Sequence, residues 1–372
     1  MFGGAERTTA NLLQFLDRRS ISRVTLVAPG VLRPLLPQRY DEFRDTTDYG
    51  LGGGFENVPK LLTDARRMAI LLREIKPNLA LGMMHYPSAL VTLGQRLSCG
   101  RMKTVASFRG PFFEYMRHHE RGFRRRLFLR AAVASTARLA DRVIVPSQGT
   151  ADELRRRFLT PTRRTVVIPN GIDLTAVENL SQQPAPELAD LPEEIPILCA
   201  IARLVPEKNL GLLLAAFQQV RSQQPAVLII LGDGPERAAL ETQIANWGLT
   251  GAVRFLGHRD NVYPYLRRAD VFIHTCQFEG FGYTMLEALA CGTAVVATDC
   301  PYGPREVLDG GEYGVLVPPH DPQALAAAVL RLLSDPVRRR ARVACGLRQA
   351  EKLSIRRMVS AYETEFLRLA NG

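Results

Sequence analysis

The sequence lacks several features that mark other classes of protein. It contains no run of about 18 apolar residues, so we expect no membrane-spanning helix. Its first apolar stretch is amphipathic and includes Asp17, Arg18 and Arg19, which argues against a secretory signal peptide. None of the six cysteines forms a C-x-x-C pair, and their spacing indicates neither a disulfide framework nor a zinc site. We therefore expect a cytoplasmic protein with reduced thiols.

The sequence does contain enough apolar residues for two globular domains. Its 372 residues are 46% hydrophobic and 23% charged. The net charge of +11 is uneven, because residues 1–180 hold 29 Lys and Arg against 16 Asp and Glu, whereas residues 181–372 hold 19 against 21. This imbalance indicates that the first half meets an anionic partner: a lipid surface, a phosphorylated acceptor or nucleic acid.

Short β-branched runs alternate with amphipathic segments along both halves. This rhythm predicts an α/β fold of two Rossmann-like domains, with parallel sheets that face each other across a cleft. We expect the first domain over 1–178, a linker rich in Pro, Gln and acidic residues over 179–195, and the second domain over 196–372. The last helix, at 355–371, is able to cross back to the first domain. Strands are expected at 24–28, 79–83, 104–108, 143–146, 165–168, 197–202, 226–231, 253–256, 271–274, 294–297 and 314–317.

The chain opens with MFGGAER, which has the pattern of a loop entering a helix. A doubly wound domain usually begins with a strand before such a loop. We therefore expect either a true start upstream of Met1 or a first domain whose sheet lacks this strand.

A glycine-rich turn with two acids follows the strand at 271–274. It reads EGFGYTMLE, with Glu279 in the loop and Glu287 two helical turns later. Gly280 and Gly282 permit close backbone approach, and the N-terminus of the helix that follows favours an anion. The two carboxylates suit a polyhydroxylated, phosphorylated ligand. A plain helix start with two solvated acids is the alternative.

Three further strand ends carry candidate ligand-binding groups. Arg203 and Lys208, in RLVPEK, have the charge to converge on a diphosphate, and two solvated cations are the alternative. The turn LGDGP places Gly232 and Gly234 where they are able to contact a ligand, and the alternative is that these glycines only form the turn. The strand end FLGHR contributes His258 and Arg259 near a nucleotide base, or ends in an ordinary surface histidine.

Taken together, these segments resemble the retaining glycosyltransferases of family 4, also called glycosyl transferases group 1, which have the two-domain GT-B fold. The resemblance spans essentially the whole chain, through GGAER, ADRVIVPS, VIPNGID, IARLVPEKN, LGDGP, RFLGHRDNV, the E-x7-E turn and TDCPYGPREVL. It implies that Arg203 and Lys208 bind the donor diphosphate, that Glu279 contacts the donor sugar and that Glu287 binds the ribose. The other residues for which it implies donor contacts are Gly3, Gly4, Gly280, Phe281, Gly282, Tyr283 and Thr284.

The resemblance also implies the chemistry. The donor is a nucleotide diphosphate sugar, with uridine as the expected base, and it is a substrate, so no cofactor is expected. The sequence has no Asp-x-Asp motif and we expect no metal. Retention by front-side attack would leave the acceptor proton to the departing phosphate, so Glu279 is not assigned as a nucleophile. Many relatives have a histidine where this chain has Arg109, and His85 is the remaining first-domain histidine near the expected cleft. Both are predicted active-site residues, and a packed loop histidine is the alternative for His85.

A basic amphipathic helix is expected within 117–142. Phe123, Leu127 and Phe128 share an apolar face beside an arginine-rich first turn, a pattern typical of anionic membrane surfaces. A solvated basic helix is the alternative. We expect a peripheral enzyme on the cytoplasmic face of the membrane that transfers a sugar to a saccharide or polyprenyl-diphosphate-linked acceptor in cell-surface polysaccharide or glycan assembly.

Other classes fit less well. Nucleic-acid binding suits the charge, but no known nucleic-acid-binding module appears in the sequence. A dehydrogenase suits the fold, but no strand is followed by G-x-G-x-x-G, and a sugar epimerase matches the motifs poorly. The remaining alternative is a non-catalytic homologue that binds a nucleotide sugar, or an inactive chain truncated at its N-terminus.

Overall fold

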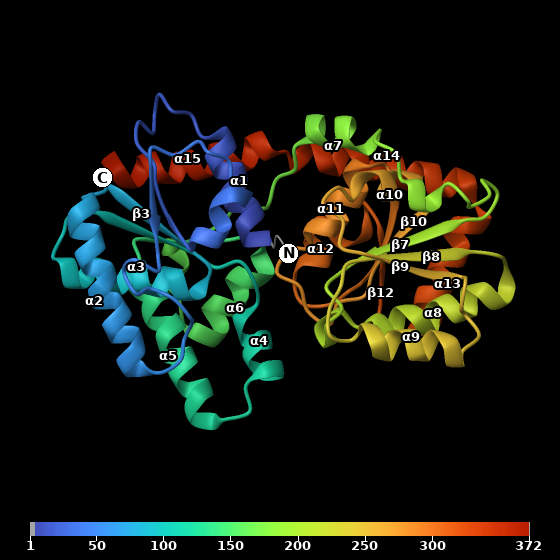
Figure 1. The fold of residues 1–372 in the computed structure, drawn as a ribbon, viewed down its shortest axis with the longest axis horizontal. Coiled ribbons are helices and arrows are strands. Elements are labelled where there is room, and N and C mark those ends of the chain that lie inside the picture. The colour runs from blue at the N-terminus through green and yellow to red at the C-terminus, as the bar shows by residue number, and fades with distance from the viewer. Residues whose placement is uncertain (1–3, 372) are drawn as a thin grey trace. The chain divides into compact units, whose positions relative to one another are not determined.

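The computed structural model describes residues 4–371 and divides them into two compact units (Figure 1). The first unit comprises 4–171 and 355–371, and the second comprises 172–354. The chain therefore changes unit at Gly171, earlier than the predicted linker at 179–195. That segment contains part of α7 (Leu174–Ser181) and η3 (Pro186–Leu188), and the buried Leu188 packs in the core of the second unit. The last helix, α15 (Ile355–Asn371), belongs to the first unit.

The first unit contains a parallel four-stranded sheet and a separate pair of strands. The sheet has the order β3 (Leu79–Met83), β4 (Lys103–Ser107), β5 (Arg142–Val145) and β6 (Thr165–Val167). A second parallel ladder joins β1 (Thr25–Ala28) to β2 (Glu42–Asp45), and no ladder within residues 4–371 joins it to β3. The helices are α1 (Gly4–Phe15), α2 (Val58–Ile75), α3 (His85–Ser98), α4 (Phe112–His119), α5 (Phe123–Leu139), α6 (Gln148–Phe158) and α15.

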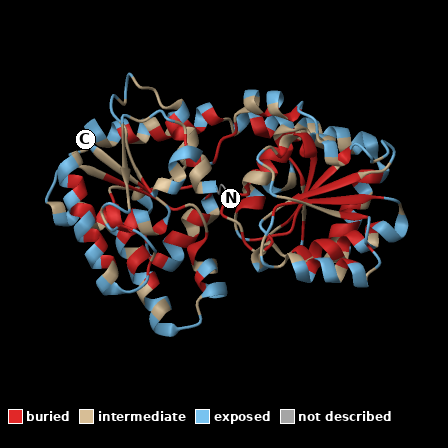
Figure 2. Cartoon of the chain, in the orientation of Figure 1, coloured by how far each residue is buried: buried red, intermediate tan, exposed pale blue. Residues whose placement is uncertain are grey.

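Both faces of the four-stranded sheet are covered. On one face, Ala106 and Val143 pack with α2, α3 and α5. On the other, Val105 and Ile144 pack against α1 and α15, including the fully buried Tyr362. Neighbouring residues of a strand point to opposite faces, so a strand covered on both faces needs apolar residues at successive positions, as at 105–106 in β4 and 143–145 in β5. The central strands β4 and β5 are mostly buried, whereas the edge strands β3 and β6 are mostly of intermediate burial (Figure 2).

The second unit is a six-stranded parallel sheet of doubly wound topology. Its order is β12 (Val315–Val317), β11 (Ala294–Thr298), β10 (Val271–His274), β7 (Ile197–Ile201), β8 (Val227–Leu231) and β9 (Val253–Gly257). The chain builds outward from β7 in one direction and then from β10 in the other. The order therefore reverses between β7 and β10, which is where such sheets bind ligands.

Helices cover this second sheet on both sides. On one side, α8 (Leu210–Gln223), α9 (Arg237–Asn246) and α13 (Pro322–Ser334) share a core with the strands. On the other, the core includes α7, α10 (Tyr263–Arg268), α11 (Tyr283–Ala290), α12 (Gly303–Val307) and α14 (Pro336–Lys352). The α/β expectation of two Rossmann-like units is confirmed. Within residues 4–371, none of the helices is both long enough and apolar enough to cross a bilayer.

Candidate functional site

The reversal point of the second sheet gathers residues from the loops after β7 and β10. These strands are hydrogen-bonded neighbours, and both end at the same edge. Lys208 ends η4 (Pro206–Lys208) in the loop after β7, and Glu279 lies in the loop after β10. The topology thus brings together two residues that are 71 positions apart in the sequence.

The loop after β7 is fastened to the loop after β10 by two hydrogen bonds. The hydroxyl of Thr275 donates to the Lys208 carbonyl at 2.9 Å, and the Gln277 amide donates to the Glu207 carbonyl at 2.9 Å. Asn209, with a left-handed φ of 51°, ends η4 and turns the chain into α8. Asn tolerates this conformation better than most residues. The backbone at Lys208 is therefore fixed beside the second loop.

The loop that carries Glu279 is held by the segment after β11. The Glu279 amide donates to the Pro301 carbonyl at 2.7 Å, and the Glu279 carbonyl accepts from the Tyr302 amide at 2.9 Å. Gly282, with φ of 93°, then starts α11 in a conformation that strongly favours glycine. The two glycines predicted to matter here therefore lie in a loop whose path is set by backbone bonds.

A half-buried ion pair occupies this point. Lys208 Nζ lies 2.8 Å from Glu279 Oε2, with side-chain exposures of 19% and 22%. Burial opposes the charged carboxylate, but Lys208 and His274 outweigh it and hold the pKa of Glu279 well below its usual range. Burial likewise disfavours the ammonium, but Cys276 and Glu279 raise the pKa of Lys208 above its usual range. Both groups are charged at neutral pH.

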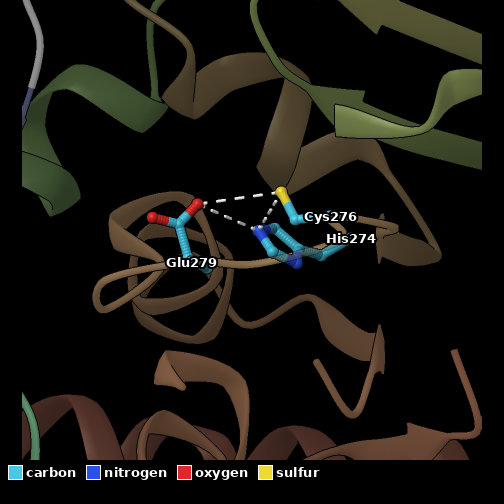
Figure 3. Close-up of side chains that lie close together, drawn as sticks. All are labelled: His274, Cys276 and Glu279. Atoms are coloured by element: carbon cyan, nitrogen blue, oxygen red, sulfur yellow. Dashed lines mark hydrogen bonds and ion pairs between the residues drawn. The ribbon is translucent and has the colours of Figure 1, made fainter. Parts of the chain in front are cut away.

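Two residues that the sequence analysis did not single out as site residues complete the cluster. His274 Nε2 lies 3.1 Å from Cys276 Sγ and 3.5 Å from Glu279 Oε2 (Figure 3). Burial disfavours the imidazolium, but Cys276 and Glu279 raise the pKa of His274 to about 9. The signal was the pattern His-x-Cys-x-x-Glu at the end of a strand, where alternate side chains share a face. The cysteine spacing had instead indicated that Cys276 is a reduced thiol outside any metal site.

The remaining predicted residues of the second unit vary in exposure. Arg203 has a side chain that is 58% exposed, and its guanidinium lies 3.3 Å from Glu207 Oε1. Gly232 has φ of 123°, and a Cβ there would lie 2.0 Å from the Ala202 carbonyl oxygen, so this turn requires glycine. Gly234 also packs against the loop after β7. Residues 280 and 281 are buried, and Tyr283 and Thr284 are half-buried in the first turn of α11.

Glu287, His258 and Arg259 lie in different environments. Glu287 is only 1% exposed, inside α11, so its predicted contact with a ribose stays a prediction. His258 is partly exposed, 3.8 Å from Asp260. Arg259 donates to Glu187 at 2.7 Å and to the Tyr265 hydroxyl at 3.2 Å, which ties the segment before β7 to the loop after β9.

The first unit holds the other predicted residues. Gly3 lies outside the described residues, and Gly4 is exposed at the start of α1. Arg109 follows β4, and its guanidinium donates to the Thr8 hydroxyl at 2.9 Å, to the Tyr362 hydroxyl at 3.0 Å and to Asn170 Oδ1. These partners come from α1, α15 and the loop after β6. The guanidinium is thus engaged within its own unit.

His85 is buried between two aromatic rings. Its ring centroid lies 4.8 Å from that of Phe108 and 4.3 Å from that of Phe112, and the residue is 8% exposed. Burial lowers the pKa of His85 to about 3, so the imidazole is neutral at physiological pH. Nε2 has no hydrogen-bond partner in the part of the chain that the structure describes. This environment corresponds to the packed-histidine alternative, and a catalytic role stays a prediction.

Two protein families match the chain. The family described as Glycosyltransferase Family 4 matches residues 2–176, and the family described as Glycosyl transferases group 1 matches residues 183–348. Together they cover most of both units.

Individual proteins with similar sequences carry related names. An uncharacterized glycosyltransferase of Methanocaldococcus jannaschii is 23% identical over 339 residues, which are 82% of this chain and 82% of that protein. The N-acetylgalactosamine-N,N'-diacetylbacillosaminyl-diphospho-undecaprenol 4-alpha-N-acetylgalactosaminyltransferase of Campylobacter jejuni is 30% identical over 202 residues. That match covers 54% of this chain and about half, 53%, of that protein.

A solved structure shows the same fold. Anabaena HepE in complex with UDP matches with a TM-score of 0.79 and 21% sequence identity, over 98% of this chain and 96% of that one. The chain is therefore a glycosyltransferase of the family 4, group 1 type, and its two Rossmann-like units are those of the GT-B fold.

Proposed function

We propose that this glycosyltransferase moves a hexose or N-acetylhexosamine from a UDP-sugar to a lipid-linked saccharide, with retention of anomeric configuration. The observation that carries the proposal is the Lys208–Glu279 pair at the reversal point of the second sheet. It sets a fixed cation and a fixed carboxylate side by side where doubly wound sheets bind nucleotides.

The two charges suit the two ends of a sugar diphosphate. When the glycosidic bond breaks, the nucleoside diphosphate gains negative charge, which a preorganised cation stabilises. Lys208 supplies such a charge from a fixed backbone, and the exposed Arg203 guanidinium, paired with Glu207, supplies a second positive charge in the same loop. Glu279 Oε2 and Oε1 are acceptors for sugar hydroxyls. The amide of Gly280 already donates to Oε1 at 3.0 Å, which orients the carboxylate.

Proton transfer does not require a protein base in this proposal. The acceptor hydroxyl attacks the anomeric carbon on the face from which the diphosphate departs, and a phosphate oxygen takes its proton. Glu279 then stabilises positive charge that develops on the sugar ring, which the low pKa of its carboxyl favours. The role of the protein is to position the donor and to provide fixed charge.

The choice of UDP and of a lipid-linked acceptor is supported by similar proteins. The Anabaena structure contains UDP, and the name of the Campylobacter enzyme specifies a diphospho-undecaprenol acceptor and an N-acetylgalactosaminyl donor group. Both are chemically compatible with a cation-containing donor site and a basic first half.

The outward surface of α4 and α5 supports attachment to an anionic membrane. Phe123 is 78% exposed and Leu127 is 58% exposed, beside the exposed Arg124 and Arg126. Phe128, expected on the same face, instead packs inward against Phe55 with ring centroids 6.3 Å apart. Because α5 buries Leu129 and its neighbours, Phe123 and Leu127 remain available at its N-terminal end. Apolar side chains among arginines suit a headgroup interface.

The test is a binding and hydrolysis screen against UDP- and GDP-sugars with EDTA present. We expect one UDP-sugar to bind and to be slowly hydrolysed, and Arg203→Ala to weaken binding about tenfold, as one diphosphate contact is lost. Arg331→Ala, an exposed arginine on α13, is the matched control and is expected to bind normally. Proton NMR of the product's anomeric centre then tests retention. If the wild type binds no nucleotide sugar, the proposed function fails.

A further inference from the structure

Three different potential metal ligands converge at the end of β10. The ligand atoms of His274, Cys276 and Glu279 all lie within 4.8 Å of one another. Figure 3 shows the imidazole, thiol and carboxylate pointing toward a common point. His274 and Cys276 are buried, and Glu279 is partly exposed. The cluster is therefore shielded on one side and reachable from the other.

The spacing of these atoms matches a tetrahedral coordination sphere. Zinc binds imidazole nitrogen, thiolate sulfur and carboxylate oxygen at about 2.0–2.3 Å, so ligand atoms on one tetrahedral ion lie about 3.3–3.7 Å apart. The three distances here are 3.1 Å for His274 Nε2 to Cys276 Sγ, 3.5 Å for Nε2 to Glu279 Oε2 and 3.7 Å for Sγ to Oε2. Shifts of a few tenths of an ångström bring all three onto one ion.

We propose that His274, Cys276 and Glu279 bind a thiophilic divalent cation of the Zn²⁺ class, with water in the fourth position, and that this ion blocks the donor site. The combination of N, S and O ligands selects zinc-like ions over Mg²⁺, which prefers six oxygen ligands. The blocking half of the proposal rests on the proposed donor site, because Glu279 Oε2 would be occupied by the ion. The ion is an inhibitor and takes no part in sugar transfer.

Binding requires the loss of protons and of one ion pair. The thiol proton of Cys276, and any proton on His274 Nε2, leave for solvent as the Zn–S and Zn–N bonds form. Lys208 Nζ, 2.8 Å from Glu279 Oε2, must give up that oxygen. Because the ammonium competes with the cation for one carboxylate oxygen and repels it, the site is reversible and weaker than a closed structural zinc site.

This competition gives the proposal a distinctive test. Lys208→Met removes the competing charge, so it is expected to strengthen metal binding at least tenfold while it weakens donor binding. Cys276→Ser and His274→Gln are expected to weaken metal binding at least a hundredfold. Cys345→Ser is the matched control, since this half-buried thiol on α14 lies in the same unit and outside the cluster.

The experiment is titration of the purified full chain with Co²⁺ and then Zn²⁺. Co²⁺ bound to a thiolate gives a near-ultraviolet charge-transfer absorption that needs neither donor nor turnover. We expect one equivalent in the wild type and in Cys345→Ser, with displacement by Zn²⁺. Thermal melting of each variant checks that it is folded. Absence of the band in the wild type, or its persistence in Cys276→Ser, would overturn the site.

The inhibition is measured separately. With EDTA removed, micromolar Zn²⁺ is expected to raise the apparent Kd for the donor found in the screen, and EDTA is expected to restore it. If Co²⁺ binds through Cys276 but the donor affinity is unchanged, the blocking half is wrong and the metal site stands. If no donor binds even with EDTA, the proposed function has failed independently of the metal site.

Discussion

Each unit has a cationic side chain after one of its parallel strands, and the two side chains differ in their hydrogen-bond partners. In the second unit, Lys208 contacts the Glu279 carboxylate, and both side chains are about one-fifth exposed. In the first unit, Arg109 donates to groups on α1, α15 and the loop after β6. The first arrangement is a single ion pair whose two charged groups remain partly exposed, whereas the second links three segments of one core.

The difference shows that a position at the carboxyl end of a parallel strand is not sufficient evidence for catalysis. What separates the two places is whether the polar group already has a set of internal partners. Breaking the Arg109 bonds would leave partly buried oxygens unpaired, which is costly. If Lys208 exchanges the Glu279 carboxylate for a phosphate of the donor, its ammonium group keeps a negatively charged hydrogen-bond acceptor. This comparison predicts opposite consequences for substitutions at the two sites.

The largest effect is expected at Lys208. Lys208→Met removes the fixed cation beside the leaving diphosphate, so kcat/KM should fall about 100- to 1000-fold, the usual loss for one transition-state contact. Melting temperature should fall by less than in Arg109→Met, because His274 Nε2 still lies 3.5 Å from Glu279 Oε2. Steady-state kinetics with the donor from the screen measure the effect. Lys352→Met is the control, because this lysine lies at the end of α14, where it donates to the Tyr313 hydroxyl and lies over the Tyr313 ring.

A stability effect is expected at Arg109. Arg109→Met removes hydrogen bonds from a charged donor and leaves Asn170 and Tyr362 without it, so unfolding should become easier by about 3 kcal/mol. Urea denaturation followed by circular dichroism measures this change, and Arg109→Lys should recover part of it. Arg109→Met would contradict this structural role if it is as stable as the wild type but loses as much activity as is expected for Lys208→Met. Arg109 would then be a catalytic residue.

Much of the fold was predictable from the sequence because most of its strands consist mainly of apolar residues. The strands at 79–83 and 271–274 were predicted at their observed bounds, and most others to within a residue or two. The strand β2 was missed because its sequence, EFRD, has no apolar face. Helix α14 has no clear apolar face in the sequence, since it is rich in arginine and buries few side chains. The sheet order cannot be read from local pattern.

The candidate site was only partly predictable for a related reason. Lys208 and Glu279 follow separate strands, and their contact depends on β7 and β10 being neighbours. His274 and Cys276 looked like the end of a strand and an isolated thiol. Burial of His85 between Phe108 and Phe112 depends on packing between β4, α3 and α4, which spacing along the chain does not reveal.

A pH effect on stability is expected from His85. Burial lowers the pKa of His85 to about 3 in the folded protein, whereas the pKa in the unfolded chain is about 6.5. Between these two pH values, His85 is protonated in the unfolded chain and neutral in the folded protein. Stability should therefore fall as pH drops below 6.5, by about 2 kcal/mol at pH 5 from this residue alone.

His85→Phe tests this effect, because the substitution keeps the ring stack and removes the titrating group. Urea denaturation at pH 7 and pH 5 should show a smaller loss of stability in the variant than in the wild type. The pH-dependent loss should be unchanged in His320→Phe, which replaces an exposed histidine of the other unit. If the free energy of unfolding depends equally on pH in the wild type and in His85→Phe, the imidazole of His85 is solvated and not buried. A large loss of kcat in His85→Phe at pH 7 would instead support its predicted catalytic role.

The smallest effect is expected on the outer surface of the first unit, where the exposed Phe123 and Leu127 lie among arginines of α5. The double substitution Phe123→Ser and Leu127→Ser should weaken binding to vesicles of anionic phospholipid about tenfold, because two exposed apolar side chains no longer enter the interface. Val337→Ser, at a 69% exposed position of the second unit, should bind as the wild type does. Co-sedimentation at low and high salt measures both. High salt should weaken vesicle binding by all three proteins, because each keeps the arginines of α5 and salt screens their attraction to anionic lipid. If the wild type does not bind at low salt, the membrane proposal fails, and the basic surface is a solvated helix face.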